Sequence, residues 1–193
     1  PMAVAVHAMR RFSISKDSSV CVIGLGTIGL LLTMFLKSEG IENVYVIGNK
    51  EMQKKYVREL DVTEEYFNTE HISADYVFEC VGKNETVNEA IELAAPDGHI
   101  IMVGNPYSDM DISKDLYWKI LRKQLKISGT WNSSYTGEVI DDWHYVLEKL
   151  EKEQINPEMF ITHEYSIDDI QTGMEIMRDK TQEYVKIMCD KKY

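Results

Sequence analysis

The sequence predicts an α/β fold of the Rossmann type, a doubly wound parallel six-stranded sheet followed by a C-terminal strand–helix–strand segment. A β-branched run enters Gly-x-Gly-x-x-Gly within residues 20–29 and continues into a helical pattern. Apolar strand-like runs then alternate with amphipathic helical stretches, which is typical of parallel strands with right-handed crossovers. The run 99–104 is almost continuously apolar, as expected for a strand covered on both faces. The expected strand order is 3-2-1-4-5-6.

The elements follow in order from a lead-in helix at 3–12 and a first strand at about 19–24, whose helix covers about 27–39. The later strands are expected at 44–48, near Glu65-Tyr66-Phe67, and at 75–82, 99–104 and 125–131. The helices between and after them are expected at 50–60, 84–95, 113–123 and 137–152. The chain closes with a strand at 160–165, a helix at 168–179 and a strand at 184–189. Residues 1–157 are therefore predicted to form the domain of the six-stranded sheet, and residues 158–193 a separate closing segment.

Composition limits the classes of partner. The chain has 193 residues, 44% of them hydrophobic, and a formal net charge of -11, which argues against nucleic acid or an anionic membrane surface as a partner. There is no run of 18 apolar residues, and Pro1-Met2-Ala3-Val4 lacks the basic and apolar regions of a signal peptide. Cys21, Cys80 and Cys189 are odd in number and widely spaced, so we expect reduced thiols in a cytoplasmic protein.

Metal-ligating and catalytic patterns are missing from the sequence. It contains no C-x-x-C and no H-x-x-x-H, so we expect no metal site in this chain. The five histidines have no paired ligand spacing and are interpreted as structural or solvated. No catalytic residue is therefore assigned.

The glycines at the first strand–helix junction fit a phosphate-binding turn. Gly24 permits the tight turn, Gly26 lets a pyrophosphate approach the backbone, and Gly29 lets the helix pack closely on the sheet. The start of the helix offers N–H groups and a partial positive charge. A plain glycine-rich turn, or a site for another nucleotide-like ligand such as a methyl donor, remains open.

The end of the second strand favours NADP(H) over NAD(H). NAD enzymes place Asp or Glu there for the ribose 2′-OH, whereas this chain has Gly48, Asn49 and Lys50. Without the carboxylate a 2′-phosphate is not repelled, and Lys50 offers a counter-charge, with Lys54 and Arg58 following at helical spacing. The alternative is that the ribose loses one contact and NAD still binds.

Several motifs together carry a family resemblance. The succession GLGTIG, FECVG and PDGHIIMVGNP resembles the cofactor domain of medium-chain, zinc-type alcohol dehydrogenases. Residues 118–125, residues 129–134 and the opening HAMRRF are similar to the polyol and polyol-phosphate branch of that family. The resemblance covers the whole chain.

The resemblance implies site residues beyond the glycines. Thr27 and Ile28 should present backbone N–H groups to the pyrophosphate. Three groups should face the nicotinamide half, at the ends of later strands: Cys80, Val81 and Gly82; Val103, Gly104 and Asn105, through their backbone; and Trp131, with Gly129 and Thr130 before it.

The resemblance also implies a larger enzyme. Family members begin with a catalytic domain that carries the zinc ligands, and Pro1 matches the proline of a Glu-Pro pair of the family. The closing segment normally returns to that catalytic domain. We therefore expect the cofactor half of a zinc-dependent dehydrogenase, acting on a polyol or sugar alcohol that is free or phosphorylated, and inactive as this chain alone. A naturally short protein, a stand-alone nucleotide-sensing module and, less favoured, a methyltransferase are the alternatives.

Two further stretches of the sequence could have a function, one in substrate binding and one in dimer formation. Lys119, Arg122, Lys123 and Lys126 form a basic cluster that is either a solvated face or a substrate-phosphate site. In the family, the segment after the fifth strand pairs antiparallel with its copy. We therefore expect a homodimer through an edge strand near 110–116, at about Met110–Ser113, with a plain loop as the alternative.

Overall fold

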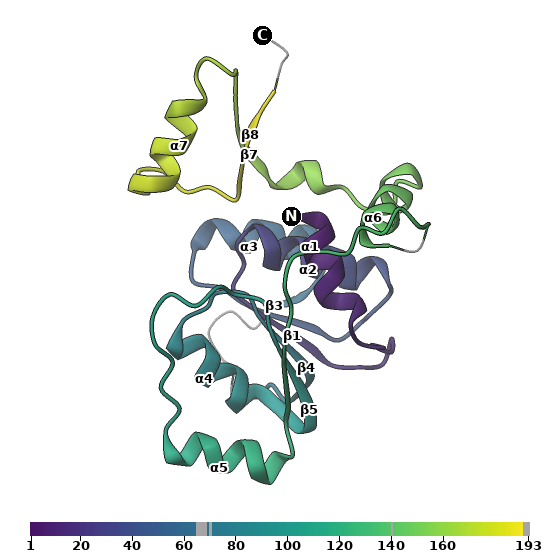
Figure 1. Ribbon diagram of the computed structural model, residues 1–193, viewed down its shortest axis with the longest axis vertical. Helices are drawn as coiled ribbons and strands as arrows, with labels where there is room; N and C mark the ends of the chain where they lie inside the picture. The colour runs from purple at the N-terminus through teal and green to yellow at the C-terminus, as the bar shows by residue number, and fades with distance from the viewer. Residues whose placement is uncertain (65–68, 70, 140, 191–193) are drawn as a thin grey trace. The chain divides into compact units, whose positions relative to one another are not determined.

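The structure is a computed structural model that describes residues 1–64, 69, 71–139 and 141–190 (Figure 1). The chain divides into two compact units, Pro1–Ile155 and Asn156–Tyr193, which are described separately. The strand expected near Glu65-Tyr66-Phe67 lies outside the described residues.

The first unit contains a six-stranded sheet in the order β3-β2-β1-β4-β5-β6, and every neighbouring pair is parallel. The predicted fold class and strand order are therefore confirmed. The strands are β1 (Val20–Ile23), β2 (Val44–Ile47), β3 (Thr63–Glu64), β4 (Ala74–Glu79), β5 (Ala94–Met102) and β6 (Lys126–Gly129).

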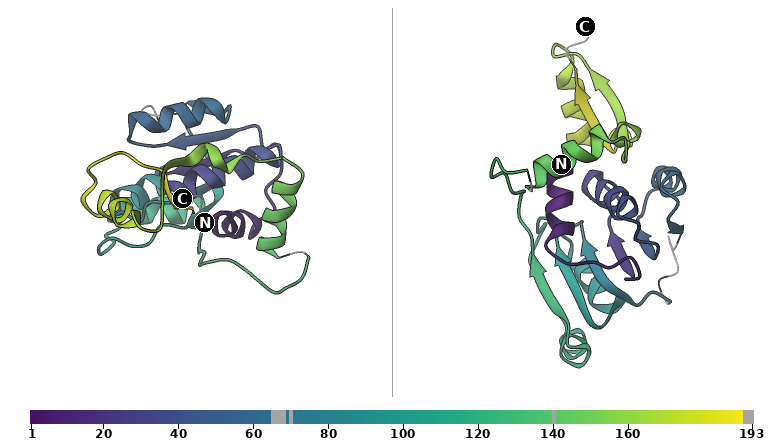
Figure 2. Two further views of the ribbon diagram at one scale, coloured as in Figure 1. Left: turned by 90° about the horizontal axis from the view of Figure 1, so that it is seen from above. Right: turned by 90° about the vertical axis from the view of Figure 1, so that its right-hand side faces the viewer.

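Helices cover both faces of the sheet, with α1, α2 and α3 on one side and α4 and α5 on the other (Figure 1). The lead-in helix α1 packs on α2 and lies beside α6, far away in the sequence (Figure 2). Their bounds are α1 (Met2–Arg10), α2 (Thr27–Ser38), α3 (Glu51–Glu59), α4 (Asn84–Leu93), α5 (Lys114–Lys123) and α6 (Asp142–Glu151).

The central strand β1 is apolar on both of its faces because helices cover both sides of the sheet. All four of its side chains are buried, and alternate residues of a strand point to opposite faces. Cys21 and Ile23 pack with Ile91 of α4 and Leu116 of α5 in one core cluster. Each fully buried aliphatic side chain contributes about 1.5–3 kcal/mol, so the doubly covered strand is a main source of stability.

The bounds of α4, β5 and α6 differ from the sequence expectation. Helix α4 ends at Leu93, and β5 already begins at Ala94. The register then shifts over the Pro96-Asp97-Gly98 turn, where Asp97 has a φ of 62°. Helix α6 begins at Asp142 rather than near 137, because the Asp141 side chain accepts the His144 N–H at 2.9 Å and caps the helix there.

The edge strand expected near 110–116 is not a strand of this chain. Residues 110–113 adopt neither helix nor strand, and residues 114–116 form the first turn of α5. The Ser113 hydroxyl caps this helix by accepting the Leu116 N–H, and the Asp111 N–H donates to Asn84 Oδ1 at 2.7 Å. The segment is therefore held as a loop against the start of α4.

The second unit has the predicted strand–helix–strand pattern. A short 3₁₀ helix η1 (Pro157–Phe160) leads into β7 (Ile161–Tyr165), which pairs parallel with β8 (Lys186–Cys189). Helix α7 (Ile170–Asp179) connects them, and a Cβ on its Gly173 would lie 2.9 Å from Ile187 Cγ2, so the helix rests closely on the strand pair. Within the described ranges, no helix has the length and apolarity needed to cross a membrane.

The basic cluster of α5 makes structural contacts. Lys119 pairs with Glu92, and the Arg122 guanidinium lies 5.4 Å from the centre of the Trp118 ring. The Lys123 ammonium donates to the carbonyl groups of Ile91, Glu92 and Ala94, at 3.2, 2.7 and 2.7 Å, and burial lowers its pKa. A cation on the last carbonyl groups of a helix satisfies both their lone pairs and the helix dipole. The contacts favour a structural role over a substrate-phosphate site.

The capping role of Lys123 is testable. Lys123→Met keeps the length of the side chain but leaves the carbonyl groups at the end of α4 without their donor. We expect the free energy of unfolding to fall by about 1–3 kcal/mol. Lys119→Met is the matched control, because an exposed ion pair is worth less than about 1 kcal/mol. Urea denaturation of both variants measures the difference, and equal effects would contradict the capping role.

Candidate functional site

The residues expected to bind the cofactor lie where parallel strands end, which places them along one edge of the sheet. They follow β1 (Gly24, Gly26, Thr27, Ile28, Gly29), β2 (Gly48, Asn49, Lys50), β4 (Cys80, Val81, Gly82), β5 (Val103, Gly104, Asn105) and β6 (Trp131).

The first and third glycines of the motif are required by the fold itself. Gly24 has a φ of 94°, and a Cβ on it would lie 2.3 Å from Val81 Cγ2. A Cβ on Gly29 would lie 1.9 Å from the Gly24 carbonyl oxygen. The start of α2 therefore touches the end of β1, an approach that only glycine permits.

The middle glycine has a different reason to be there. Gly26 is the N-cap of α2, has an ordinary φ of -76°, and its missing Cβ would meet nothing within 4 Å. Gly26 offers no side-chain cap to α2, and the space where its Cβ would lie is open. This arrangement fits a pyrophosphate, which would take the place of a capping side chain.

The loop after β4 is organised by a buried carboxylate. Glu79 is 1% exposed, and its side chain accepts the N–H groups of Val81 at 2.8 Å and Gly82 at 2.9 Å. The Thr86 hydroxyl of α4 donates to the same carboxylate at 2.8 Å. A carboxylate of the protein itself therefore bonds to the loop before α4 and to the first turn of that helix, whereas α2 has no side-chain cap.

The loop after β5 packs against this loop. The N–H groups of Val103 and Gly104 both donate to the Glu79 carbonyl oxygen, at 2.8 and 2.9 Å. A Cβ on Gly104 would lie 2.2 Å from the Gly82 nitrogen, and one on Gly82 1.8 Å from the Asn105 carbonyl oxygen. Because the N–H groups of Val103 and Gly104 are bonded internally, backbone contacts of these two residues to a ligand would use their carbonyl groups.

Cys80 is a half-buried, neutral thiol at the end of β4. Burial raises its pKa, and the charge of Glu79 adds to the shift. Because a thiolate is the nucleophilic and metal-binding form, Cys80 is suited to packing beside a ligand rather than to either chemistry.

The loop after β2 presents its polar side chains outward. Asn49 and Lys50 are exposed, and Gly48 stands where a carboxylate would bind the ribose diol. Lys54 is paired with Glu51 at 2.7 Å, which offsets part of its charge. Lys50 is therefore the cation that this loop itself contributes.

The segment after β6 is anchored by two neighbouring buried aspartates, Asp141 and Asp142. Asp142 accepts the Ser134 N–H at 2.7 Å. It also contacts two residues of α1, His7 at 2.8 Å and Arg10 at 3.3 Å. These contacts tie the chain beyond Trp131 to the lead-in helix. Trp131 itself is 73% exposed.

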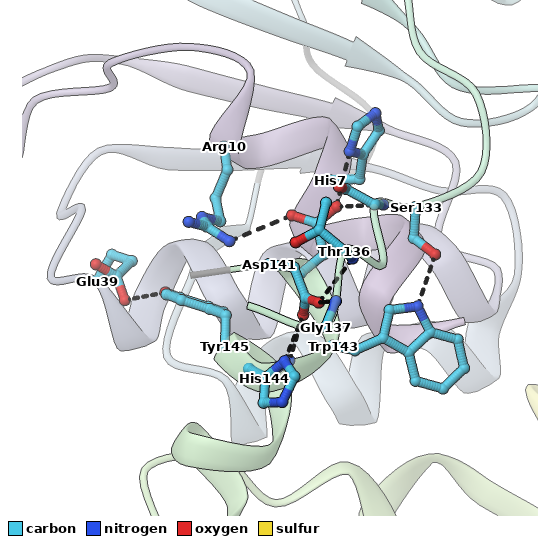
Figure 3. A network of polar contacts seen from close by, with 12 residues as sticks. His7, Arg10, Glu39, Ser133, Thr136, Gly137, Asp141, Trp143, His144 and Tyr145 are labelled. Carbon is cyan, nitrogen blue, oxygen red and sulfur yellow. Dashed lines mark hydrogen bonds and ion pairs between the residues drawn. The ribbon is translucent and has the colours of Figure 1, made fainter. Parts of the chain in front are cut away.

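Asp141 holds the tip of the same segment (Figure 3). Its carboxylate accepts N–H groups from Thr136 at 3.0 Å, Gly137 at 3.1 Å and His144 at 2.9 Å. Burial alone would raise the pKa of Asp141, but these hydrogen bonds and the His144 ring hold it well below its usual range. The carboxylate therefore stays charged and holds the backbone at Thr136 and Gly137 in place.

Two organising residues were not identified from the sequence. Glu79 is a carboxylate in an otherwise apolar strand end, and Gln53 is the third residue of α3. A charged residue at the last buried position of a strand, and Gln at the third position of a predicted helix, were the signals that could have found them.

The described residues contain no group of three or more His, Cys, Asp or Glu side chains able to hold a metal ion.

A parallel sheet in this order, with a glycine-rich turn at the start of α2, defines a Rossmann nucleotide-binding fold. The family description "zinc-binding dehydrogenase" matches residues 27–152, more than half of the chain. The chain therefore belongs to the zinc-binding dehydrogenase family, which confirms the resemblance.

Curated relatives are about twice as long as this chain. It is 26% identical over 184 residues to galactitol 1-phosphate 5-dehydrogenase of Escherichia coli K12, covering 87% of this chain and 52% of the relative. It is 28% identical over 202 residues to sorbitol dehydrogenase of Halalkalibacterium halodurans, covering 97% and 56%. The chain thus spans about half the length of these polyol-type dehydrogenases.

Solved structures share the fold. Staphylococcus aureus TarJ in complex with NADPH superposes with a TM-score of 0.79 at 22% identity, covering 97% of this chain and 61% of that one. A protein described as a short chain alcohol dehydrogenase from Escherichia coli CFT073, complexed with NADH, has a TM-score of 0.81 at 19% identity, covering 97% and 56%.

The two glycine roles predict opposite outcomes for stability. Gly29→Ala drives a Cβ into the Gly24 carbonyl group, so the free energy of unfolding should fall by at least about 2 kcal/mol. Gly26→Ala places a methyl group in open space at an allowed φ, and the change should stay within about 0.5 kcal/mol. Thermal or urea unfolding of the two variants checks this, and an equally large loss in Gly26→Ala would mean that Gly26 is structural.

Proposed function

We propose that this chain is the cofactor-binding part of a zinc-dependent alcohol or polyol dehydrogenase, whose substrate is a polyol or sugar alcohol, free or phosphorylated. The full-length reaction is hydride transfer between a secondary alcohol and C4 of a nicotinamide dinucleotide. The observation that carries the proposal is Gly26, which opens the start of α2 to a phosphate inside a chain of the zinc-binding dehydrogenase family.

In this proposal the chain's own residues bind and orient the cofactor. The backbone at Gly26, Thr27 and Ile28 receives the pyrophosphate at the start of α2. The loops after β4 and β5, braced by Glu79, flank the nicotinamide half with Val81 and the carbonyl groups of residues 103–105. The nicotinamide, when bound, accepts or donates the hydride. The residues around it keep its ring fixed relative to the substrate.

The zinc of such an enzyme requires ligands that the described residues do not provide. We place those ligands, and most substrate contacts, in a part of the protein outside this chain. The closing strand–helix–strand unit then belongs to that catalytic part. Its exposed Met174, Met177 and Met188 provide apolar surface for such a contact.

A stand-alone nucleotide-sensing module is the second candidate. Its supporting observation is that the first unit has its own core and a complete six-stranded sheet. Family membership and the length of the relatives favour the dehydrogenase. A preceding reading frame that encodes a Cys- and His-bearing domain ending in Glu would decide between the two.

The absence of a carboxylate at Gly48 and the presence of Lys50 favour NADP(H) over NAD(H). Similar solved structures hold either cofactor, NADPH in one and NADH in another. We further propose a cytoplasmic protein and a homodimer, in which the loop 110–113 rearranges to pair with its copy. The acidic charge gives no support to a nucleic acid or membrane partner.

Cofactor choice can be measured directly. NADPH should bind about tenfold to a hundredfold more tightly than NADH, since charge-assisted contacts to the 2′-phosphate contribute about 1.5–3 kcal/mol. Gly48→Asp should reverse the preference by restoring a diol acceptor and repelling the phosphate. Lys50→Ala should weaken NADPH and leave NADH nearly unchanged. Calorimetric titration of both cofactors into each protein provides the measurement.

The matched control for Lys50→Ala is Lys54→Ala, because the charge of Lys54 is shared with Glu51. It should weaken NADPH less than Lys50→Ala does. Equal affinities for the two cofactors in the wild type, or tighter NADH, would mean that the loop 48–50 does not select the phosphate.

Binding and turnover should separate in this chain. We expect it to bind NADPH but to oxidise no polyol, because the described residues lack a zinc ligand set. Gly26→Ala should weaken NADPH at least about tenfold, as its methyl group displaces the pyrophosphate by steric contact. Fluorescence titration and an NADP⁺-reduction assay with sorbitol and galactitol test both points. A measurable oxidation rate, or unchanged binding by Gly26→Ala, would contradict the proposal.

A further inference from the structure

One buried side chain connects two loops of the candidate cofactor site. Gln53, in the first turn of α3, is 6% exposed. Its Nε2 donates to the Leu25 carbonyl oxygen at 2.9 Å, inside the glycine-rich turn. Its Oε1 accepts the N–H groups of Asn49 and Lys50, both at 3.1 Å. A single amide thus joins the loop after β1 to the loop after β2.

The link made by Gln53 lies just beyond the ends of β1 and β2. The last ladder-like bond between the two strands runs from the Gly24 N–H to the Ile47 carbonyl oxygen at 2.8 Å. The paired register of β1 and β2 ends at Ile23 and Ile47, and past this point the Gln53 amide links residues 49 and 50 to Leu25. Because the Gln53 side chain is buried, moving residues 49 and 50 away from Leu25 would leave buried donors or acceptors unpaired, which is costly.

The amide also decides which groups of the loop face a ligand. Since the N–H groups of Asn49 and Lys50 turn inward to Gln53, the exposed side chains of these residues are the groups turned outward. In a dinucleotide the adenosine ribose lies one carbon from the pyrophosphate. The distance between Gly26 and the loop 48–50 must therefore match that short span for the 2′ position to be recognised.

We propose that Gln53 is a positioning residue for cofactor selectivity, which holds the loop 48–50 at the correct distance from the pyrophosphate-binding turn. It does not contact the cofactor itself, because it is buried between the two loops. The inference rests on the proposed function of this chain as the dinucleotide-binding part of a dehydrogenase.

The test uses Gln53→Met, which keeps the side-chain length and removes all three hydrogen bonds. Gln53→Asn is the second variant, because it keeps the amide but is one methylene too short to reach both loops. Gln154→Met, at an exposed position, is the matched control. The ratio of the NADH and NADPH dissociation constants, measured by calorimetry, should move toward one by about fivefold or more in both Gln53 variants and remain unchanged in the control.

A second readout needs no cofactor. In the unliganded protein, NMR hydrogen exchange of the Asn49 and Lys50 amides should accelerate in Gln53→Met, while amides in the middle of β1 keep their protection. A role limited to general stability would instead lower the unfolding temperature and weaken both cofactors in parallel, with the ratio unchanged.

The outcomes distinguish the two proposals. A wild type that binds neither dinucleotide overturns the proposed function and this inference with it. A wild type that binds both and discriminates, together with Gln53 variants that keep its ratio, overturns the inference alone. A wild-type ratio of one overturns the inference as well. Loss of selectivity together with faster exchange at residues 49 and 50 supports it.

Discussion

The contact between the start of α2 and the end of β1 is the constraint on which the candidate site depends. Because Gly29 has no Cβ, the first turn of α2 rests against the Gly24 carbonyl group, where any other residue would collide at 1.9 Å. That contact aims the helix N-terminus along the sheet edge where the strands end. Gly26 then leaves the space in front of it open. Two glycines are thus required for the fold, and one for the opening that the fold creates.

The hydrogen-bond donors along this edge are divided between internal and external partners. In the loop after β2, the N–H groups of Asn49 and Lys50 donate to the Gln53 side chain. In the loop after β4, those of Val81 and Gly82 donate to the Glu79 side chain. Internal acceptors make these loops rigid without a ligand, which lowers the entropy cost of binding. The start of α2 has no capping side chain, which is why the proposed phosphate site is placed there.

Much of the fold could be predicted from the sequence, because periodicity and glycine spacing are local signals. These signals predicted the strand order, the alternation of strands and helices, and the strand–helix–strand segment at the end of the chain. The bridges made by Gln53 and Glu79 were not, since each joins a side chain to backbone groups whose position depends on the finished sheet. The late start of α6 has a similar cause, because the Asp141 carboxylate that caps it also binds the N–H groups of Thr136 and Gly137, which local sequence does not place beside it. The segment 110–113 could not be assigned from local pattern, because a strand there requires a second chain to pair with.

The charge distribution explains how an acidic chain can still offer a site for a polyanion. The net charge of -11 is spread over the chain, and salt screens exposed charges beyond about 8 Å. Three carboxylates close to the loops, Glu79, Asp141 and Asp142, are buried and bonded to N–H groups. Their charge is directed into the protein, where it organises loops. The groups left at the open end of β1 are neutral backbone dipoles, and a lysine stands at the end of β2. In the proposed site, affinity for a phosphate would then depend on geometry within a few ångströms, so we expect the Gln53 bridge between these two loops to matter more than the total charge.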